Sequence, residues 1–111
     1  MNYYLNYGTR TDKSIEAVRK DLVNTLDIID EKRSSDYFGE YYKCTGGSID
    51  KLNIYTNNAD LIQYPSEFQI VIDISFTKGR IEDRLTRYQI VKAELNKIEY
   101  LINFKDLTIE D

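Results

Sequence analysis

Residues 67–76, EFQIVIDISF, carry the clearest structural pattern in the chain. Every second position holds a large apolar residue: Phe68, Ile70, Ile72, Ile74 and Phe76. The positions between them are mostly polar. This period of two predicts a β-strand with one face in the core.

The segment after this strand has the period of a helix instead. KGRIEDRLTRYQIVKAELNKIEYLI at 78–102 places apolar residues three or four positions apart: Ile81, Leu85, Tyr88, Val91, Leu95, Ile98 and Ile102. That spacing predicts one long amphipathic helix. The tail, 103–111, predicts a last strand through Phe104, Leu107 and Ile109.

Two further strands are predicted before residue 67. They are DYFGEYYKC at 36–44 and KLNIYTN at 51–57, and the glycines of TGGS at 45–48 predict a turn between them. If Phe38, Tyr42 and Cys44 point into the core, then the residues that point out of the first strand are Tyr37, Tyr41 and Lys43.

The N-terminal part predicts a strand and then a helix. NYYLNY at 2–7 alternates as a half-buried strand that Gly8 ends. The helix is predicted to begin at Thr11 or Asp12 as its cap, and its apolar stripe is Ile15, Val18, Leu22, Leu26 and Ile29. The polar run DEKRSSD at 30–36 is predicted to close the helix as a loop.

These segments predict one α+β domain over residues 1–111 with two layers. Its sheet is mainly antiparallel, with four to five strands, and both amphipathic helices cover one face. The other face of such a sheet must meet water or a partner.

The residue types exclude several kinds of catalytic site. The chain has no histidine, which removes histidine-based nucleophile activation and histidine metal sites. No phosphate-binding glycine loop is present, Cys44 is expected to be a small core residue, and Asp27, Asp30 and Glu31 lack the spacing of a calcium loop. We therefore expect a protein that is not an enzyme and that needs no cofactor and no metal.

Two motifs still allow a different chemistry. Glu40 beside Phe38 and Tyr42 could act as a catalytic carboxylate, although a strand edge or a bulge at Gly39 explains it better. Arg80, Arg84 and Arg87 lie near one face of the predicted second helix and could contact RNA. The acids Glu82 and Asp83 interrupt that row, which favours a solvated helix flank.

Charge is distributed unevenly along the chain, whose net charge is −4. Residues 21–73 hold ten acidic and four basic residues, whereas 78–97 hold six basic and three acidic ones. The acidic majority disfavours nucleic acid and suits a basic protein partner, although an acidic surface can also serve solubility alone. Without a predicted membrane span or secretory signal, we expect a cytoplasmic protein that binds no membrane.

The ten tyrosines suggest how such a partner would be held. The strand residues expected on the outward face are Tyr4, Asn6, Asn53, Tyr55, Glu67, Gln69, Val71 and Asp73. Tyrosine and asparagine are typical of protein-recognition surfaces, but aromatic residues also stabilise sheets by cross-strand pairing. Both interpretations remain open.

A short, acidic α+β chain, rich in Tyr, Asn, Ile and Lys and without a catalytic motif, resembles the bacterial immunity proteins of contact-dependent growth inhibition and related polymorphic toxin systems. The resemblance covers the whole chain in size, charge and element order. It implies a protein that binds the toxin domain of its own system and blocks its active site. Many such toxins are basic nucleases.

From the residues, we expect the partner to be met by exposed aromatic and acidic side chains: Asp36, Tyr37, Glu40, Tyr41, Tyr55, Asp60, Glu67 and Asp73. Three alternatives remain. The protein could be a phage- or plasmid-encoded inhibitor of a defence nuclease, a small enzyme or RNA-binding domain, or a homodimer that buries the open face of its sheet.

Overall fold

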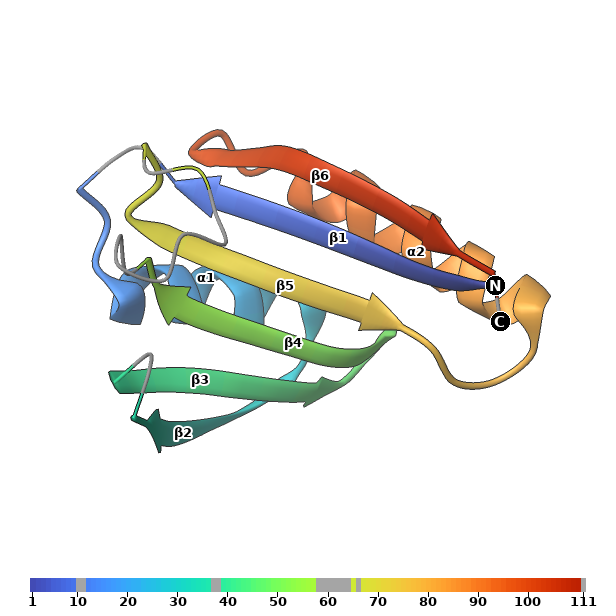
Figure 1. The fold of residues 1–111 in the computed structure, drawn as a ribbon, viewed down its shortest axis with the longest axis horizontal. Helices are drawn as coiled ribbons and strands as arrows, with labels where there is room; N and C mark the ends of the chain where they lie inside the picture. The colour runs from blue at the N-terminus through green and yellow to red at the C-terminus, as the bar shows by residue number, and fades with distance from the viewer. Residues whose placement is uncertain (10–11, 37–38, 58–64, 66, 111) are drawn as a thin grey trace.

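A computed structural model of the protein describes residues 1–9, 12–36, 39–57, 65 and 67–110. Along that part of the chain, the elements are β1 (Asn2–Thr9), α1 (Ile15–Leu26), β2 (Ile29–Ser35), β3 (Gly39–Gly46), β4 (Ile49–Thr56), β5 (Ile70–Phe76), α2 (Ile81–Leu95) and β6 (Leu101–Ile109). Figure 1 shows both helices on the same side of one sheet.

The six strands of the described chain form one antiparallel sheet in the order β2-β3-β4-β5-β1-β6. The α+β class and the antiparallel sheet are therefore confirmed, and the prediction of four to five strands was too low. The strand that carries EFQIVIDISF lies inside the sheet, between β4 and β1. Five of its seven residues are apolar, and its buried residues include Val71 on the face away from the helices as well as the inward isoleucines.

The additional strand is β2, which the prediction treated as a loop. Its residues are mostly exposed, and it pairs with β3 from Ile29 opposite Thr45 to Ser35 opposite Gly39. A charged edge strand of this kind has no apolar alternation to reveal it, and its charges protect the edge from further pairing. Ile29, predicted in the helix stripe, is instead 74% exposed in this strand.

Both helices are shorter than predicted. Ser14 caps α1, because its hydroxyl accepts a hydrogen bond from the Ala17 amide at 3.1 Å, so the predicted cap at Asp12 was wrong and Thr11 lies outside the described residues. The helix ends where Asp27 takes a left-handed conformation with φ of 52°.

The second helix, α2, ends at Leu95, and Ile102 belongs to β6. A tight turn with hydrogen bonds such as Ile98 N to Leu95 O closes the helix. At its other end, Ile81 and Leu85 are exposed, so the predicted apolar stripe is buried only from its middle onward. That first turn lies at the end of the sheet where β1 starts (Figure 1).

The core fills the space between the sheet and the helices. Its largest fully buried side chains include Tyr7, Phe76, Leu5, Leu22, Ile72 and Leu95. In the described chain, no helix has the length and apolar character to cross a membrane.

Among the described residues, five tyrosines take part in this packing: Tyr3, Tyr7, Tyr42, Tyr88 and Tyr100. The Tyr42 hydroxyl on β3 donates to Glu16 of α1 at 2.6 Å, and Tyr88 of α2 donates to Asp106 of β6 at 2.5 Å. Tyr100 reaches Asp21 of α1 in the same way at 2.7 Å. In each pair, the ring packs with apolar residues while the hydroxyl meets a carboxylate, and hydrogen bonds to charged groups are worth about 1.5–3 kcal/mol.

Candidate functional site

The face of the sheet opposite the helices, here called the open face, carries a row of polar side chains across five strands. Strand register places Lys43 opposite Asn53, and Asn53 opposite Asp73. It then places Asp73 opposite Asn6, and Asn6 opposite Lys105. Successive strands contribute one residue each, so residues that are far apart in the sequence become cross-strand neighbours. Figure 1 shows these five strands side by side in the sheet.

The middle of this row consists of a hydrogen-bonded pair, Asn6 and Asp73, and of the buried side chain of Asn53. Asn6 donates from Nδ2 to the Asp73 carboxylate. Asn53 is only 6% exposed, and its Oδ1 accepts no hydrogen bond from the described residues. A buried carbonyl oxygen without a donor costs free energy, so this position favours an additional donor.

The open face is hollowed over this row. One hollow of about 440 Å³ is lined by the middle of the row together with Tyr4, Lys51, Tyr55, Ser75 and Lys105. A second, of about 340 Å³, shares Tyr4, Lys51 and Ser75 and extends toward Lys43 and Lys78. The two hollows form one polar depression with lysines around it.

Two tyrosines stand next to the depression. The rings of Tyr41 and Tyr55 lie 5.2 Å apart on β3 and β4. Burial, with smaller contributions from Asp73 and Tyr41, raises the pKa of Tyr55 to about 12. Its hydroxyl therefore remains protonated at neutral and mildly alkaline pH.

Near Gly8, the open face is covered by two aromatic rings, those of Phe68 and Phe104. The Phe68 ring, 2% exposed, lies over Gly8 and stacks on Phe104 at 4.9 Å. The prediction put Phe68 in the main core with Ile70 and Phe76. It was wrong because β5 begins only at Ile70, and the turn before it directs Phe68 to the opposite side.

The structure brings together three of the eight predicted partner-binding residues. Tyr41, Tyr55 and Asp73 share the open face. Glu40 has the strand parity of the buried Tyr42, lies on the helix side and pairs with Lys32 at 3.1 Å. Asp36 and Glu67 are exposed beside strand ends, whereas Tyr37 and Asp60 lie outside the described residues.

The lysines of the open face were missed as binding residues. Alternation within β4 was sufficient to place Lys51 with Asn53 and Tyr55, but the prediction weighed only aromatic and acidic types. Lys105 could not have been placed in this way, because the register of β6 shifts opposite Asn6 and Tyr7.

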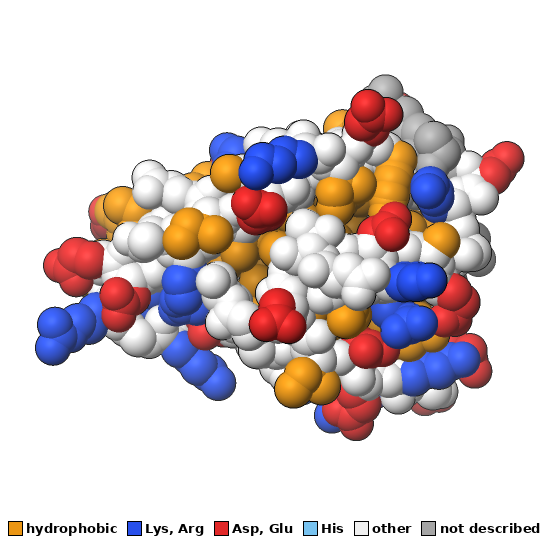
Figure 2. Space-filling model, turned by 180° about the vertical axis from the view of Figure 1, so that it is seen from behind, with side chains coloured by type: hydrophobic (Ala, Val, Ile, Leu, Met, Phe, Trp, Pro, Cys, Tyr) orange, Lys and Arg blue, Asp and Glu red, His pale blue; other side chains and the backbone are white. Residues whose placement is uncertain are grey.

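Much of the negative charge of residues 21–73 is neutralised by ion pairs in the folded protein. Four carboxylates of this segment have a cationic partner: Asp30 with Arg19, Glu31 with Arg33, Glu40 with Lys32 and Asp50 with Arg87. On the helix side, Figure 2 shows blue and red side chains interspersed rather than separated. No uniformly acidic surface results from the described residues.

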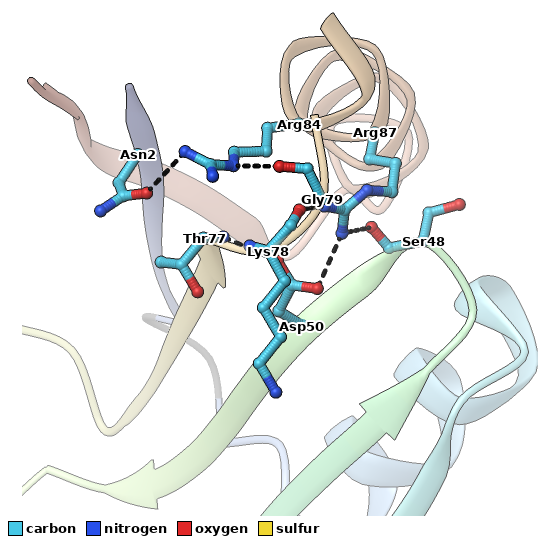
Figure 3. Close-up of polar contacts among 8 residues, drawn as sticks. All are labelled: Asn2, Ser48, Asp50, Thr77, Lys78, Gly79, Arg84 and Arg87. Atoms are coloured by element: carbon cyan, nitrogen blue, oxygen red, sulfur yellow. Dashed lines mark hydrogen bonds and ion pairs between the residues drawn. The ribbon is translucent and has the colours of Figure 1, made fainter. Parts of the chain in front are cut away.

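The arginine row of α2 has a structural use (Figure 3). Arg87 donates to the Asp50 carboxylate and to the Ser48 carbonyl, at 3.0 and 3.3 Å. Arg84 donates to the carbonyl of Gly79 and to the side chain of Asn2. These contacts fix the start of α2 against β1 and β4, and they occupy two of the three arginines proposed for RNA.

Asp50 links three parts of the chain at this point. Its carboxylate accepts from the amides of Thr77 and Lys78, at 2.7 and 2.9 Å, as well as from Arg87. Burial alone would raise the pKa of Asp50, but the Lys78 amide, the Arg87 guanidinium and the Thr77 amide outweigh it and lower the pKa below 3.8. The ionised carboxylate therefore stabilises the folded state.

We expect Asp50→Asn to lower the free energy of unfolding by about 1–2 kcal/mol at neutral pH. Because the folded pKa is depressed, this contribution is present above the unfolded pKa and disappears as pH falls through the folded pKa. The difference between wild type and variant should shrink between about pH 5 and about pH 2 in urea unfolding experiments. A difference that stays constant over that range would contradict the assignment.

The single cysteine of the sequence, Cys44, does not line the hollows of the open face. Cys44 is buried in the core, and burial raises the pKa of its thiol to about 12, so it is not a nucleophile. Within the described ranges, no group of three or more acidic or cysteine side chains could hold a metal ion. In comparisons with known proteins, no protein family matches this sequence, and no characterised protein is similar to it.

Proposed function

We propose that this protein is a non-catalytic inhibitor that binds a partner protein through the open face of its sheet. In its most specific form, the proposal is that of an immunity protein, which neutralises the toxin domain of its own system by covering the active site. A phage- or plasmid-encoded inhibitor of a defence nuclease would use the same surface.

The single observation behind the proposal is the open face itself. In the described chain, both helices lie on the other side, and the uncovered side presents Tyr4, Tyr41 and Tyr55 around the polar row. Tyrosine offers large contact area with little loss of side-chain freedom, and asparagine adapts its hydrogen bonds to a partner. A broad and shallow surface with these side chains suits a protein better than an enclosed small molecule.

The open face carries both positive and negative side chains. The sequence suggested an acidic, Tyr-rich contact surface, but Lys51 and Lys105 stand beside Asp73 on the open face. The contact would therefore be mixed, with tyrosines as the main anchors and both signs of charge around them.

The test begins with the gene directly upstream, where the proposal expects a toxin domain to be encoded, and co-expresses that domain with this protein. Wild-type protein should restore growth and should bind the purified toxin domain in calorimetry. Tyr55→Ala should raise the dissociation constant about 30-fold, because aromatic anchors of an interface are worth about 2 kcal/mol or more. Tyr41→Ala should have a similar effect, since the two rings lie together.

Ile90→Ala provides the matched control. It also truncates a large exposed side chain, 50% exposed, but from α2 in the layer behind the sheet, so binding should be unchanged. Thermal unfolding of each variant separates lost contacts from lost folding. If wild type neither binds nor protects, the function is wrong; if the tyrosine variants bind like wild type, the chosen face is wrong.

A further inference from the structure

Four lysines surround the depression on the open face. Lys51 and Lys105 line the first hollow, and Lys43, Lys51 and Lys78 line the second. None of the four forms an ion pair with any residue in the described part of the chain.

Six other cations of the described chain form ion pairs: Arg19, Lys32, Arg33, Arg87, Lys92 and Lys97. Arg19, Arg87 and Lys92, for example, each pair with a carboxylate at the boundary between helices and sheet. Carboxylates are more numerous than cations in this chain, so four lysines around one depression, none paired with a carboxylate of the described residues, are a local concentration of positive charge.

The acids in the depression do not cancel this charge. Asp50 is already neutralised by Arg87. Asp73 is the other carboxylate of the lining, and it accepts a hydrogen bond from Asn6. The lining therefore has an excess of two positive charges over negative ones, although the whole protein carries −4.

The lining of the first hollow includes Asn53, whose side-chain oxygen lacks a hydrogen-bond donor among the described residues. Asn53 is more than nine-tenths buried, and its Oδ1 has no donor among the described residues. This oxygen requires an N–H or O–H group, whereas the lysines above it require an anion. A ligand that satisfies both must carry negative charge next to a hydrogen-bond donor.

We infer that the depression receives an acidic segment of the partner protein, with side-chain carboxylates between Lys51, Lys105 and Lys43 and a neighbouring N–H directed at Asn53. This inference rests on the proposed function and specifies its partner. The contacted part of the partner is acidic, not basic as the sequence suggested.

A protein segment fits better than a nucleic acid. The positive charge is confined to the depression, and the remainder of this acidic protein would repel a polyphosphate that continues beyond it, since charges interact over about 10 Å at moderate salt. Asp73 in the middle of the row would add to that repulsion. A folded partner can present two or three carboxylates here and neutral or basic groups elsewhere.

The experiment reverses charge on the open face. Lys51→Glu and Lys105→Glu should each weaken binding of the toxin domain roughly tenfold and reduce its dependence on salt, because they place like charges opposite the partner's carboxylates. Lys20→Glu is the matched control: it changes net charge equally on an exposed residue of α1, behind the sheet, and should have little effect.

A second arm needs no toxin. Fluorescently labelled poly-L-glutamate and polyuridylate are titrated with the protein, and poly-L-glutamate should bind more tightly and lose affinity in Lys51→Glu and Lys105→Glu only. Equal effects of all three lysine variants, no binding of poly-L-glutamate, or preferential binding of polyuridylate through the same lysines would each overturn the inference. A wild-type protein that binds poly-L-glutamate in this way but no toxin domain would reject the proposed function alone.

Discussion

Gly8→Ala should lower the free energy of unfolding by about 2–3 kcal/mol, a large cost for one methyl group. Gly8 lies in β1 under the Phe68 ring, and an added Cβ would stand 2.6 and 2.7 Å from the two δ carbons of that ring. Phe68 is buried and stacked on Phe104, so moving its ring away from Gly8 would expose it and would break the stacking on Phe104.

A double-mutant cycle tests this cause. In a Phe68→Ala background the ring is absent, so Gly8→Ala should cost less than about 0.5 kcal/mol when measured by urea unfolding. An equal cost in both backgrounds would mean that Gly8 is required for some other reason, such as its backbone conformation.

Stability should also fall steeply in alkaline solution. Burial, and carboxylates next to several hydroxyls, raise the pKa of five tyrosines above the ordinary value of 10.0: Tyr7, Tyr42, Tyr55, Tyr88 and Tyr100. In the unfolded chain these phenols ionise near pH 10. In the folded state the phenols hold their protons to higher pH. Tyr42, Tyr88 and Tyr100 then still donate to Glu16, Asp106 and Asp21, and Tyr7 still donates to the side chain of Asn96.

The sign of this pH dependence follows from the difference between the folded and unfolded pKa values of the tyrosines. A raised folded pKa means that the tyrosines contribute their full stability below pH 10, and that this contribution disappears as pH rises above 10 toward the folded pKa. Each such group changes stability by about 1.4 kcal/mol per pH unit in that range. Tyr7 and Tyr100 alone should therefore remove about 3 kcal/mol between about pH 10 and about pH 11.5.

Urea unfolding followed by circular dichroism at several alkaline pH values measures this loss. Tyr7→Phe and Tyr100→Phe should each reduce the slope of stability against pH, because phenylalanine has no proton to lose. The exposed control Lys20→Ala should leave the slope unchanged. Constant stability up to about pH 11 would show that these phenols ionise equally well in the folded protein.

Residues of the open face could be predicted from the sequence in the regular strands β4 and β5, but not in β6 or in the turn before β5. Asn53, Tyr55 and Asp73 were placed on the outward face correctly, because β4 and β5 are regular and alternate without interruption. Glu40 was grouped with them by residue type although its strand parity puts it on the helix side. Phe68 and Lys105 depend on a turn and on a register shift, and neither leaves a periodic signal.

The sequence by itself determined the α+β class, the inward faces of the regular strands and the presence of both helices, because burial of apolar side chains on one face produces periods of two and 3.6. Only the tertiary structure decided that β2 is a strand, that Tyr42 and Tyr88 join helices to the sheet, and that four lysines surround one depression on an acidic protein. Those features depend on which strands become neighbours and on which charges find partners. Contacts between distant residues settle both, and local periodicity does not record them.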